Sequence, residues 1–100
     1  MSVQIAVPKD KIAAFCKRNR IRRLALFGSV TRDDFTPNSD VDVLVDFEPD
    51  ARVGFITLAG MEIELGELLG QKAEIHTAKG LNPRFRDEVL AAAEVQYEQA

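Results

Sequence analysis

The apolar positions of this chain follow two periods, one typical of helices and one typical of strands. Residues 8–19 carry apolar side chains at helical spacing. Residues 55–69 predict a longer amphipathic helix, which Gly70 is well placed to end. Its apolar stripe consists of Phe55, Leu58, Met61, Leu65 and Leu68.

Three shorter apolar runs predict strands, and a second amphipathic pattern follows the last of them. The runs cover residues 21–27, 41–47 and 73–77, and β-branched residues are frequent in the second. Residues 33–39, which contain Pro37 and Asn38, read as a loop. Asn82 is predicted to cap a final helix that starts at Pro83. The buried face of that helix is expected to comprise Phe85, Val89 and Ala92.

The order of these elements predicts a small mixed α/β (or α+β) fold. It runs helix, strand, short helix or turn, strand, helix, strand, helix, which gives a mixed sheet of three to four strands. We expect the helices to cover one face of the sheet and to leave the other face free for polar chemistry. With 100 residues and no visible linker, residues 1–100 are interpreted as a single domain.

Composition narrows the function classes. Hydrophobic residues make up 46% of the chain and the formal net charge is −3, which argues against DNA binding driven by overall charge. We expect no sequence-specific nucleic-acid binding and no membrane span, because the apolar runs are short. No N-terminal leader is apparent, and the lone cysteine, Cys16, cannot form an internal disulfide. A cytoplasmic location is therefore expected.

The most informative spacing joins Gly28-Ser29 to Asp40-Val41-Asp42, with ten residues between them. Side chains at i and i+2 of a strand share a face, so Asp40 and Asp42 are predicted to project together. Two neighbouring carboxylates favour a hard divalent cation such as Mg²⁺ or Mn²⁺. A glycine after an apolar strand lets a phosphate approach the backbone, and Ser29 adds a hydroxyl and an N–H. Together these features indicate a nucleotidyl-transfer site.

Each of these residues also has a structural interpretation. Asp40 could simply end the loop, and Asp42 could be a solvated strand position. Ser29 could cap a short helix, which is compatible with phosphate binding at the same helix start. Lone His76 is expected to be structural, because no second histidine or cysteine supports a transition-metal site.

Four segments resemble the minimal nucleotidyltransferases (MNT), small members of the polymerase-β-like superfamily. Residues 26–30 (LFGSV) resemble the family's first motif and residues 39–45 (SDVDVLV) its second. Residues 72–75 (KAEI) occupy the third-carboxylate strand, and residues 80–83 (GLNP) resemble the segment that commonly follows. Among these proteins, the chain is most similar to antitoxins whose partner is an all-helical HEPN ribonuclease toxin.

The resemblance implies roles for particular residues. Asp40, Asp42 and Glu74 would be the catalytic and metal-binding carboxylates, holding one or two Mg²⁺ ions that bridge ATP. Gly28 and Ser29 would hold the β- and γ-phosphates, and Arg32 would be a further phosphate contact. Glu74 would bind a second metal or accept the proton of the attacking hydroxyl.

The chain departs from the family pattern at two places. Arg32-Asp33 stands where Arg-Gly is frequent, and Glu74 stands where aspartate is frequent. A separate basic cluster is interpreted either as a solvated helix end or as a patch facing an acidic partner or RNA. It comprises Lys17, Arg18, Arg20, Arg22 and Arg23.

Three functions remain open at this stage. The resemblance implies an antitoxin that transfers AMP from ATP to a tyrosine hydroxyl of a HEPN toxin. A non-catalytic antitoxin would neutralise the toxin by steric binding alone, which the two departures would allow. A nucleotidyltransferase acting on a small molecule is the third, although no accessory domain is present to bind such an acceptor.

Overall fold

The computed structural model describes residues 5–32 and 35–99, so Asp33 and Asp34 of the expected loop lie outside it. Helices and strands alternate as the hydrophobic pattern predicts. In chain order the elements are α1 (Lys9–Arg18), β1 (Ile21–Phe27), the 3₁₀ turn η1 (Gly28–Thr31), β2 (Val41–Phe47), α2 (Phe55–Leu69), β3 (Ala73–His76), the 3₁₀ turn η2 (Ala78–Gly80), α3 (Pro83–Ala92) and β4 (Glu94–Glu98).

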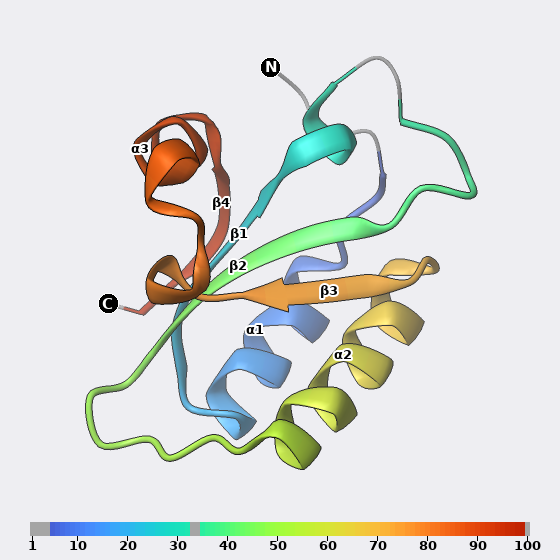
Figure 1. Ribbon diagram of the computed structural model, residues 1–100. Coiled ribbons are helices and arrows are strands. Elements are labelled where there is room, and N and C mark those ends of the chain that lie inside the picture. The colour runs from blue at the N-terminus through green and yellow to red at the C-terminus, as the bar shows by residue number, and fades with distance from the viewer. Residues whose placement is uncertain (1–4, 33–34, 100) are drawn as a thin grey trace.

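The four strands form one mixed sheet in the order β3-β2-β1-β4 (Figure 1). β1 lies antiparallel to β2 and β4, whereas β2 and β3 run parallel. The predicted mixed sheet is therefore confirmed. β4 was not among the predicted strands, although Val95 and Tyr97 alternate with polar residues in the manner of a half-buried strand.

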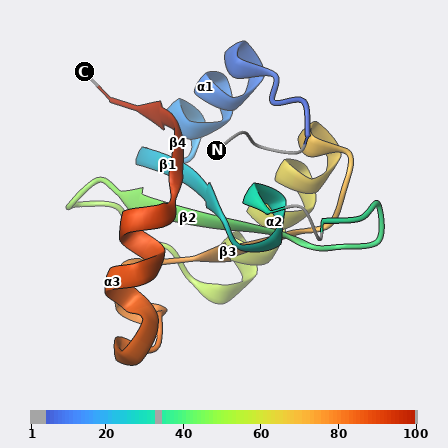
Figure 2. The same ribbon diagram turned by 90° about the horizontal axis from the view of Figure 1, so that it is seen from above.

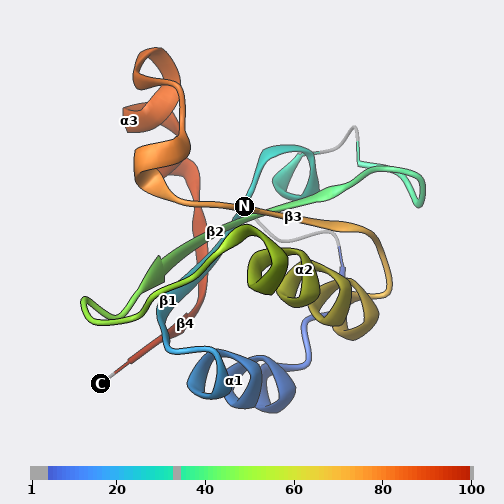
Figure 3. The ribbon, with the colours of Figure 1, turned by 60° about the horizontal axis from the view of Figure 1, so that its bottom comes forward.

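Helices α1 and α2 cover one face of the sheet, and the hydrophobic core lies between them and the strands (Figures 1 and 3). The core side chains come from both helices and from the inward-facing strand positions. Among those that are fully shielded from solvent are Ile12, Phe15, Leu24, Leu26, Val41, Val43 and Leu65. Burial of these side chains is the main stabilising contribution expected for a domain of this size.

The final helix corrects the expectation that all helices share one face. α3 lies on the side of the sheet opposite α1 and α2 (Figures 2 and 3), and none of its residues is buried. Phe85 is 55% exposed and Ala92 is also exposed, while Val89 is only half-buried. The chain must cross from edge strand β3 to the opposite edge strand β4, and the other face is already occupied by α1 and α2.

A second correction concerns the start of α2. Met61, Leu65 and Leu69 are its buried residues, and Leu58 and Leu68 pack partly against the core. Phe55 is 92% exposed, because the first turn precedes the part of the helix that packs on the sheet. Hydrophobic periodicity predicts which face of a helix is apolar, but it does not predict how far the underlying surface extends.

The structure confirms the residues that were predicted to end α2 and to cap α3. Gly70 ends α2 in the left-handed region at φ +76°, and its N–H donates to the Gly66 carbonyl at 2.8 Å. The Asn82 side chain accepts a hydrogen bond from the Arg84 N–H at 2.9 Å, with Pro83 in the first turn. Within residues 5–32 and 35–99, no helix is long and apolar enough to cross a membrane.

Candidate active site

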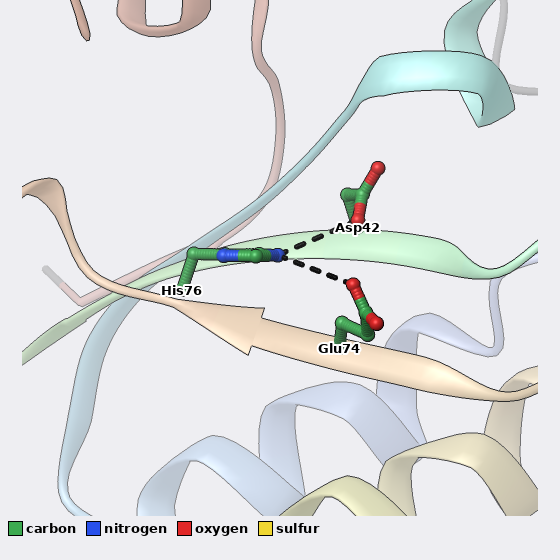
Figure 4. A group of neighbouring side chains, drawn as sticks. All are labelled: Asp42, Glu74 and His76. Carbon is green, nitrogen blue, oxygen red and sulfur yellow. Dashed lines mark ion pairs between the residues drawn. The ribbon is translucent and has the colours of Figure 1, made fainter. Parts of the chain in front are cut away.

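The parallel pairing of β2 and β3 places two acidic side chains next to each other. Asp42 pairs with Glu74, and Leu44 pairs with His76 two residues further along. Because side chains alternate across a strand, these positions face away from the core, to which β2 and β3 contribute Val41, Val43 and Ile75 among others. Asp42 and Glu74 therefore meet on the sheet face opposite α1 and α2 (Figure 4).

His76 completes this cluster, although the absence of a second histidine or cysteine nearby in the sequence predicted only a structural role for it. Its Nε2 atom lies 3.4 Å from Asp42 Oδ1 and 3.8 Å from Glu74 Oε2. That nitrogen is buried and makes no hydrogen bond. The signal that could have found it is its spacing, since His76 stands two residues after Glu74 and shares its face of the strand.

The glycine turn lies directly against the same carboxylates. Gly28 follows β1, whose last residue, Phe27, pairs with Asp42. Its φ of +76° favours glycine, and a Cβ atom there would lie 2.5 Å from Asp42 Oδ2. The Thr31 hydroxyl donates a hydrogen bond to the Gly28 carbonyl at 2.8 Å, which holds the turn closed. Gly28 is thus required for the close approach of the turn to Asp42.

Ser29 and Arg32 lie in and directly after the same turn. Ser29 is half-buried, and its carbonyl accepts a hydrogen bond from the Arg32 N–H at 2.9 Å. The turn starts at Gly28 and is preceded by Phe27, so Ser29 does not cap it. Arg32 is exposed. Phosphate binding by Ser29 and Arg32 stays a prediction.

Asp40 stands directly before β2, which begins at Val41, so it ends the preceding loop. Among the described residues, the group of clustered candidate ligands contains Asp42, Glu74 and His76 and not Asp40. A joint projection of Asp40 and Asp42 stays a prediction.

The loop before Asp40 is held by one glutamine. The Gln71 side-chain nitrogen donates to the Ser39 carbonyl at 2.9 Å and lies 3.3 Å from the carbonyls of Thr36 and Pro37. The Val41 N–H donates to the Lys72 carbonyl at 2.8 Å, which starts the β2–β3 ladder beside it. Gln71 therefore positions the segment that leads into Asp40.

The clustered donors fit a divalent cation. The candidate ligand atoms of Asp42, Glu74 and His76 lie within 4.8 Å of one another. Ligands about 2.1 Å from one ion are separated by about 3 Å when adjacent and about 4.2 Å when opposite. Small side-chain rotations would bring these three atoms into that range. The buried nitrogen without a hydrogen-bond partner adds to the fit, since a metal would satisfy it.

A hollow of about 480 Å³ lies along the later part of β2, and none of Gly28, Asp42, Glu74 and His76 lines it. Its walls include Ala25 and Leu44 on the strands, Lys79 in η2 and Leu90 in α3. Leu44 follows Asp42 by two residues along β2. The volume of the hollow is in the range of small-molecule sites.

The basic cluster does not form an open positive patch. Each of its four arginines has an acidic partner: Arg18 pairs with Glu64 at 2.5 Å, Arg20 with Asp50 at 2.6 Å, Arg22 with Asp46 at 2.6 Å and Arg23 with Glu98 at 4.0 Å. The pairs are exposed and contribute little to stability. They do neutralise the arginines, which favours the interpretation as a solvated surface.

A glycine turn against one carboxylate, with a second carboxylate paired to it on the adjacent strand, is the arrangement expected of a nucleotidyl-transfer site. The sequence profile of the nucleotidyltransferase domain family matches residues 9–95. The chain therefore belongs to the nucleotidyltransferase family. This confirms the class that the sequence resemblance indicated.

Two relatives and one solved structure show more closely what the chain is similar to. A Methanocaldococcus jannaschii protein assigned as a protein adenylyltransferase is 29% identical over 85 residues, which are 85% of this chain and 89% of that protein. A second such protein from the same organism is 29% identical over 75 residues, or 73% of this chain and 74% of that protein. A solved structure described as a minimal nucleotidyltransferase is 34% identical, with a TM-score of 0.69 and 85% of each chain covered.

More distant structures share the fold. A toxin–antitoxin structure with AMP-PNP superposes with a TM-score of 0.73 at 17% identity, covering 93% of this chain and 75% of that chain. A complex of a tri-AMPylated Shewanella oneidensis HEPN toxin with an MNT antitoxin superposes with a TM-score of 0.65 at 15% identity, covering 91% and 70%. At these identities the likeness shows a common fold.

Proposed function

We propose that this chain is a metal-dependent protein adenylyltransferase that acts as an antitoxin. It transfers AMP from ATP to a tyrosine hydroxyl of a HEPN ribonuclease toxin. The observation that carries the proposal is the meeting of Asp42 and Glu74 on one face of the sheet, with the Gly28 turn against Asp42. The nature of its relatives, which are assigned as protein adenylyltransferases, supports a protein acceptor.

The proposed reaction joins the tyrosine oxygen to the α-phosphorus of ATP. The bond from that phosphorus to the bridging oxygen of the β-phosphate breaks, and pyrophosphate leaves with the electron pair. Asp42 and Glu74, with Asp40 at the end of the adjoining loop, would hold Mg²⁺. The bound metal supplies charge neutralisation for the triphosphate. A Glu74 oxygen would accept the phenolic proton.

The glycine turn would hold the phosphates. Because Gly28 has no side chain, the turn lies directly against the Asp42 carboxylate, which would bring the phosphates close to the metal ligands. Ser29 offers a hydroxyl and an N–H in the same turn, and Arg32 follows it. The hollow beside Leu44 and Leu90 has room for the nucleoside. This arrangement positions the nucleotide along the exposed face of β2.

The acceptor would be a separate protein that docks onto this face. The described residues form a sheet with three helices, and the partner would bring its hydroxyl to the exposed face of β2 and β3. The HEPN toxin of the superposed complex is itself tri-AMPylated and is bound to an MNT antitoxin. An added AMP group brings negative charge and bulk, which would block RNA from a toxin active site.

The test is intact-mass measurement of the co-transcribed toxin after incubation with this chain, ATP and Mg²⁺. We expect a mass increase of one or more AMP groups with the unaltered chain and none with Asp42→Asn. Asp50→Asn is the matched control, because Asp50 is an exposed carboxylate in the turn after β2 and lies away from the cluster. Equal AMP transfer by Asp42→Asn would contradict the proposal.

Steric neutralisation is the second candidate, and one surface favours it. Phe55, Ile56 and Ile63 of α2 are 92%, 90% and 68% exposed, and apolar residues exposed in this way favour protein contacts. In that case the toxin would stay unmodified and would recover activity once the antitoxin is removed. The same mass measurement, followed by a ribonuclease assay of the separated toxin, distinguishes the two candidates.

A further inference from the structure

We propose that His76 is a metal ligand of this site, so that the site binds a first-row transition ion such as Co²⁺ or Zn²⁺ in preference to Mg²⁺. The inference deepens the proposed function, on which it rests for the use of the metal in AMP transfer. It concerns a residue that the carboxylate pattern of the sequence does not include, and it arises from the pairing of β3 with β2.

The first argument is the position of the imidazole nitrogen. Nε2 of His76 points between the carboxylates of Asp42 and Glu74, at 3.4 Å and 3.8 Å from their nearer oxygens (Figure 4). Both separations lie between the roughly 3 Å and 4.2 Å expected of two ligands on one ion. One cation can therefore be shared by a nitrogen and two carboxylates without rearrangement of the strands.

The second argument is that the nitrogen makes no hydrogen bond. Nε2 is shielded from solvent, and polar atoms in that position are nearly always hydrogen-bonded. Its neighbours are the Asp42 and Glu74 carboxylates, which lie at ion-pair distance but too far away or too poorly aligned for a hydrogen bond. A metal between the three groups would bind this nitrogen and both carboxylates.

The third argument is that the ring is held in place. Phe27, the last residue of β1, meets the His76 ring edge-to-face, with 5.4 Å between centroids and 67° between planes. Such pairs are favourable and directional. Because Phe27 also pairs with Asp42 across the sheet, the same strand end orients both the imidazole and the carboxylate. A preorganised ligand loses little entropy when a metal binds.

The chemistry of the donor set decides the selectivity. Mg²⁺ prefers oxygen ligands in near-ideal octahedral geometry, whereas imidazole suits zinc and the later first-row ions. An imidazole added to the carboxylates therefore raises the affinity for transition ions more than the affinity for Mg²⁺. Replacing the imidazole should weaken the transition ions selectively and should affect Mg²⁺ little.

The test measures metal binding to the whole chain without nucleotide or partner. Titration calorimetry would compare Co²⁺ and Mg²⁺ on the unaltered protein, His76→Phe and His76→Gln. Phe keeps the aromatic contact with Phe27, and Gln keeps a polar side chain if Phe impairs folding. We expect Co²⁺ to bind at least about tenfold more weakly to both variants, with Mg²⁺ affinity changed less than about threefold. Unchanged Co²⁺ affinity, or equal losses for both ions, would overturn the inference.

A second measurement reads the ligand directly. His76 is the single histidine of the chain, so its imidazole nitrogens give one set of NMR signals. We expect a stoichiometric shift of the Nε2 signal with Zn²⁺ and none of comparable size with Mg²⁺. Since neither measurement involves AMP transfer, loss of the transfer proposal would leave this result standing, and absence of a Zn²⁺ shift would reject the ligand while leaving transfer open.

Discussion

Gly28 and Asp42 occupy adjoining space: a Cβ atom on Gly28 would lie 2.5 Å from the Asp42 carboxylate. A glycine turn and a carboxylate that are fourteen positions apart in the sequence therefore act as one unit. Gly28 also has a φ of +76°, so two independent constraints act on the same residue. Comparison of a Gly28 substitution with one at a glycine that has the same φ but open space shows how much of the effect comes from the contact with Asp42.

Gly28→Ala should abolish most AMP transfer and should destabilise the fold. Left-handed backbone costs an L-residue roughly 1–2 kcal/mol, and the methyl group would also displace Asp42. Gly70→Ala is the matched control, since Gly70 has the same φ of +76° but open space around its Cβ position. Chemical denaturation and a transfer assay would show similar backbone strain in both variants but loss of transfer in Gly28→Ala alone. Equal activity of the two would contradict a role for the contact.

The contributions of Asp40 and Asp42 to transfer should be separable by substitution. Asp42→Asn should lower transfer by orders of magnitude while the fold survives, because it removes a metal ligand and relieves repulsion from Glu74. Asp40→Asn should also lower transfer if nucleotide and metal draw the loop end toward the cluster. Transfer rates at saturating ATP and thermal unfolding would be measured for each. Full activity of Asp40→Asn would restrict the metal site to the group on β2 and β3.

Two substitutions at Glu74 separate the effect of its negative charge from the effect of its side-chain length. Glu74→Gln keeps the length and removes the charge, and it should impair transfer strongly. Glu74→Asp keeps the charge, matches the residue frequent in the resembled family, and should be tolerated better. Single-turnover rates would rank the two. Unimpaired transfer by Glu74→Gln would make Glu74 a solvated strand residue.

Gln71 should act on transfer through the loop that it holds. Gln71→Met keeps the side-chain length and removes the donor that contacts the Ser39, Thr36 and Pro37 carbonyls. We expect a loss of about 1 kcal/mol in unfolding free energy and faster amide exchange across residues 36–41. Transfer should fall through kcat more than through KM for ATP. Gln96→Met, which removes an exposed contact with Lys9, is the control. Unchanged exchange rates in Gln71→Met would show that other contacts hold the loop.

Cys16 should be inert in the folded protein. Its side chain is buried in the core against Ile12 and Phe15, and burial raises the pKa of its thiol to about 12 by removing the water that would solvate the thiolate. At pH 8 the thiol is protonated and inaccessible, so alkylation should proceed only through unfolding. Its rate should rise with denaturant in step with the loss of structure. Rapid labelling of the native protein would contradict this burial.

Local chemistry was enough to predict most of the secondary structure. The α2 bounds, the αL stop at Gly70 and the Asn82 cap follow from side-chain periodicity and from the backbone preferences of single residues. The side of the sheet taken by α3 does not, because it depends on where α1 and α2 already lie. β4 was missed for a related reason: the alternation of Val95 and Tyr97 with polar residues is short, and the strand is stabilised by its pairing with β1.

The same distinction between local sequence and tertiary structure applies to the residues of the candidate site. The spacing of Gly28, Ser29, Asp40 and Asp42 already indicated nucleotidyl transfer, because residue type and separation along the chain carry that chemistry. Only the tertiary structure decided that Glu74 meets Asp42, that His76 joins them and that Asp40 stands just outside the strand. Strand register is set by the packing of one whole face of the sheet against the helices, so the neighbours on the other face become known only when the core is assembled.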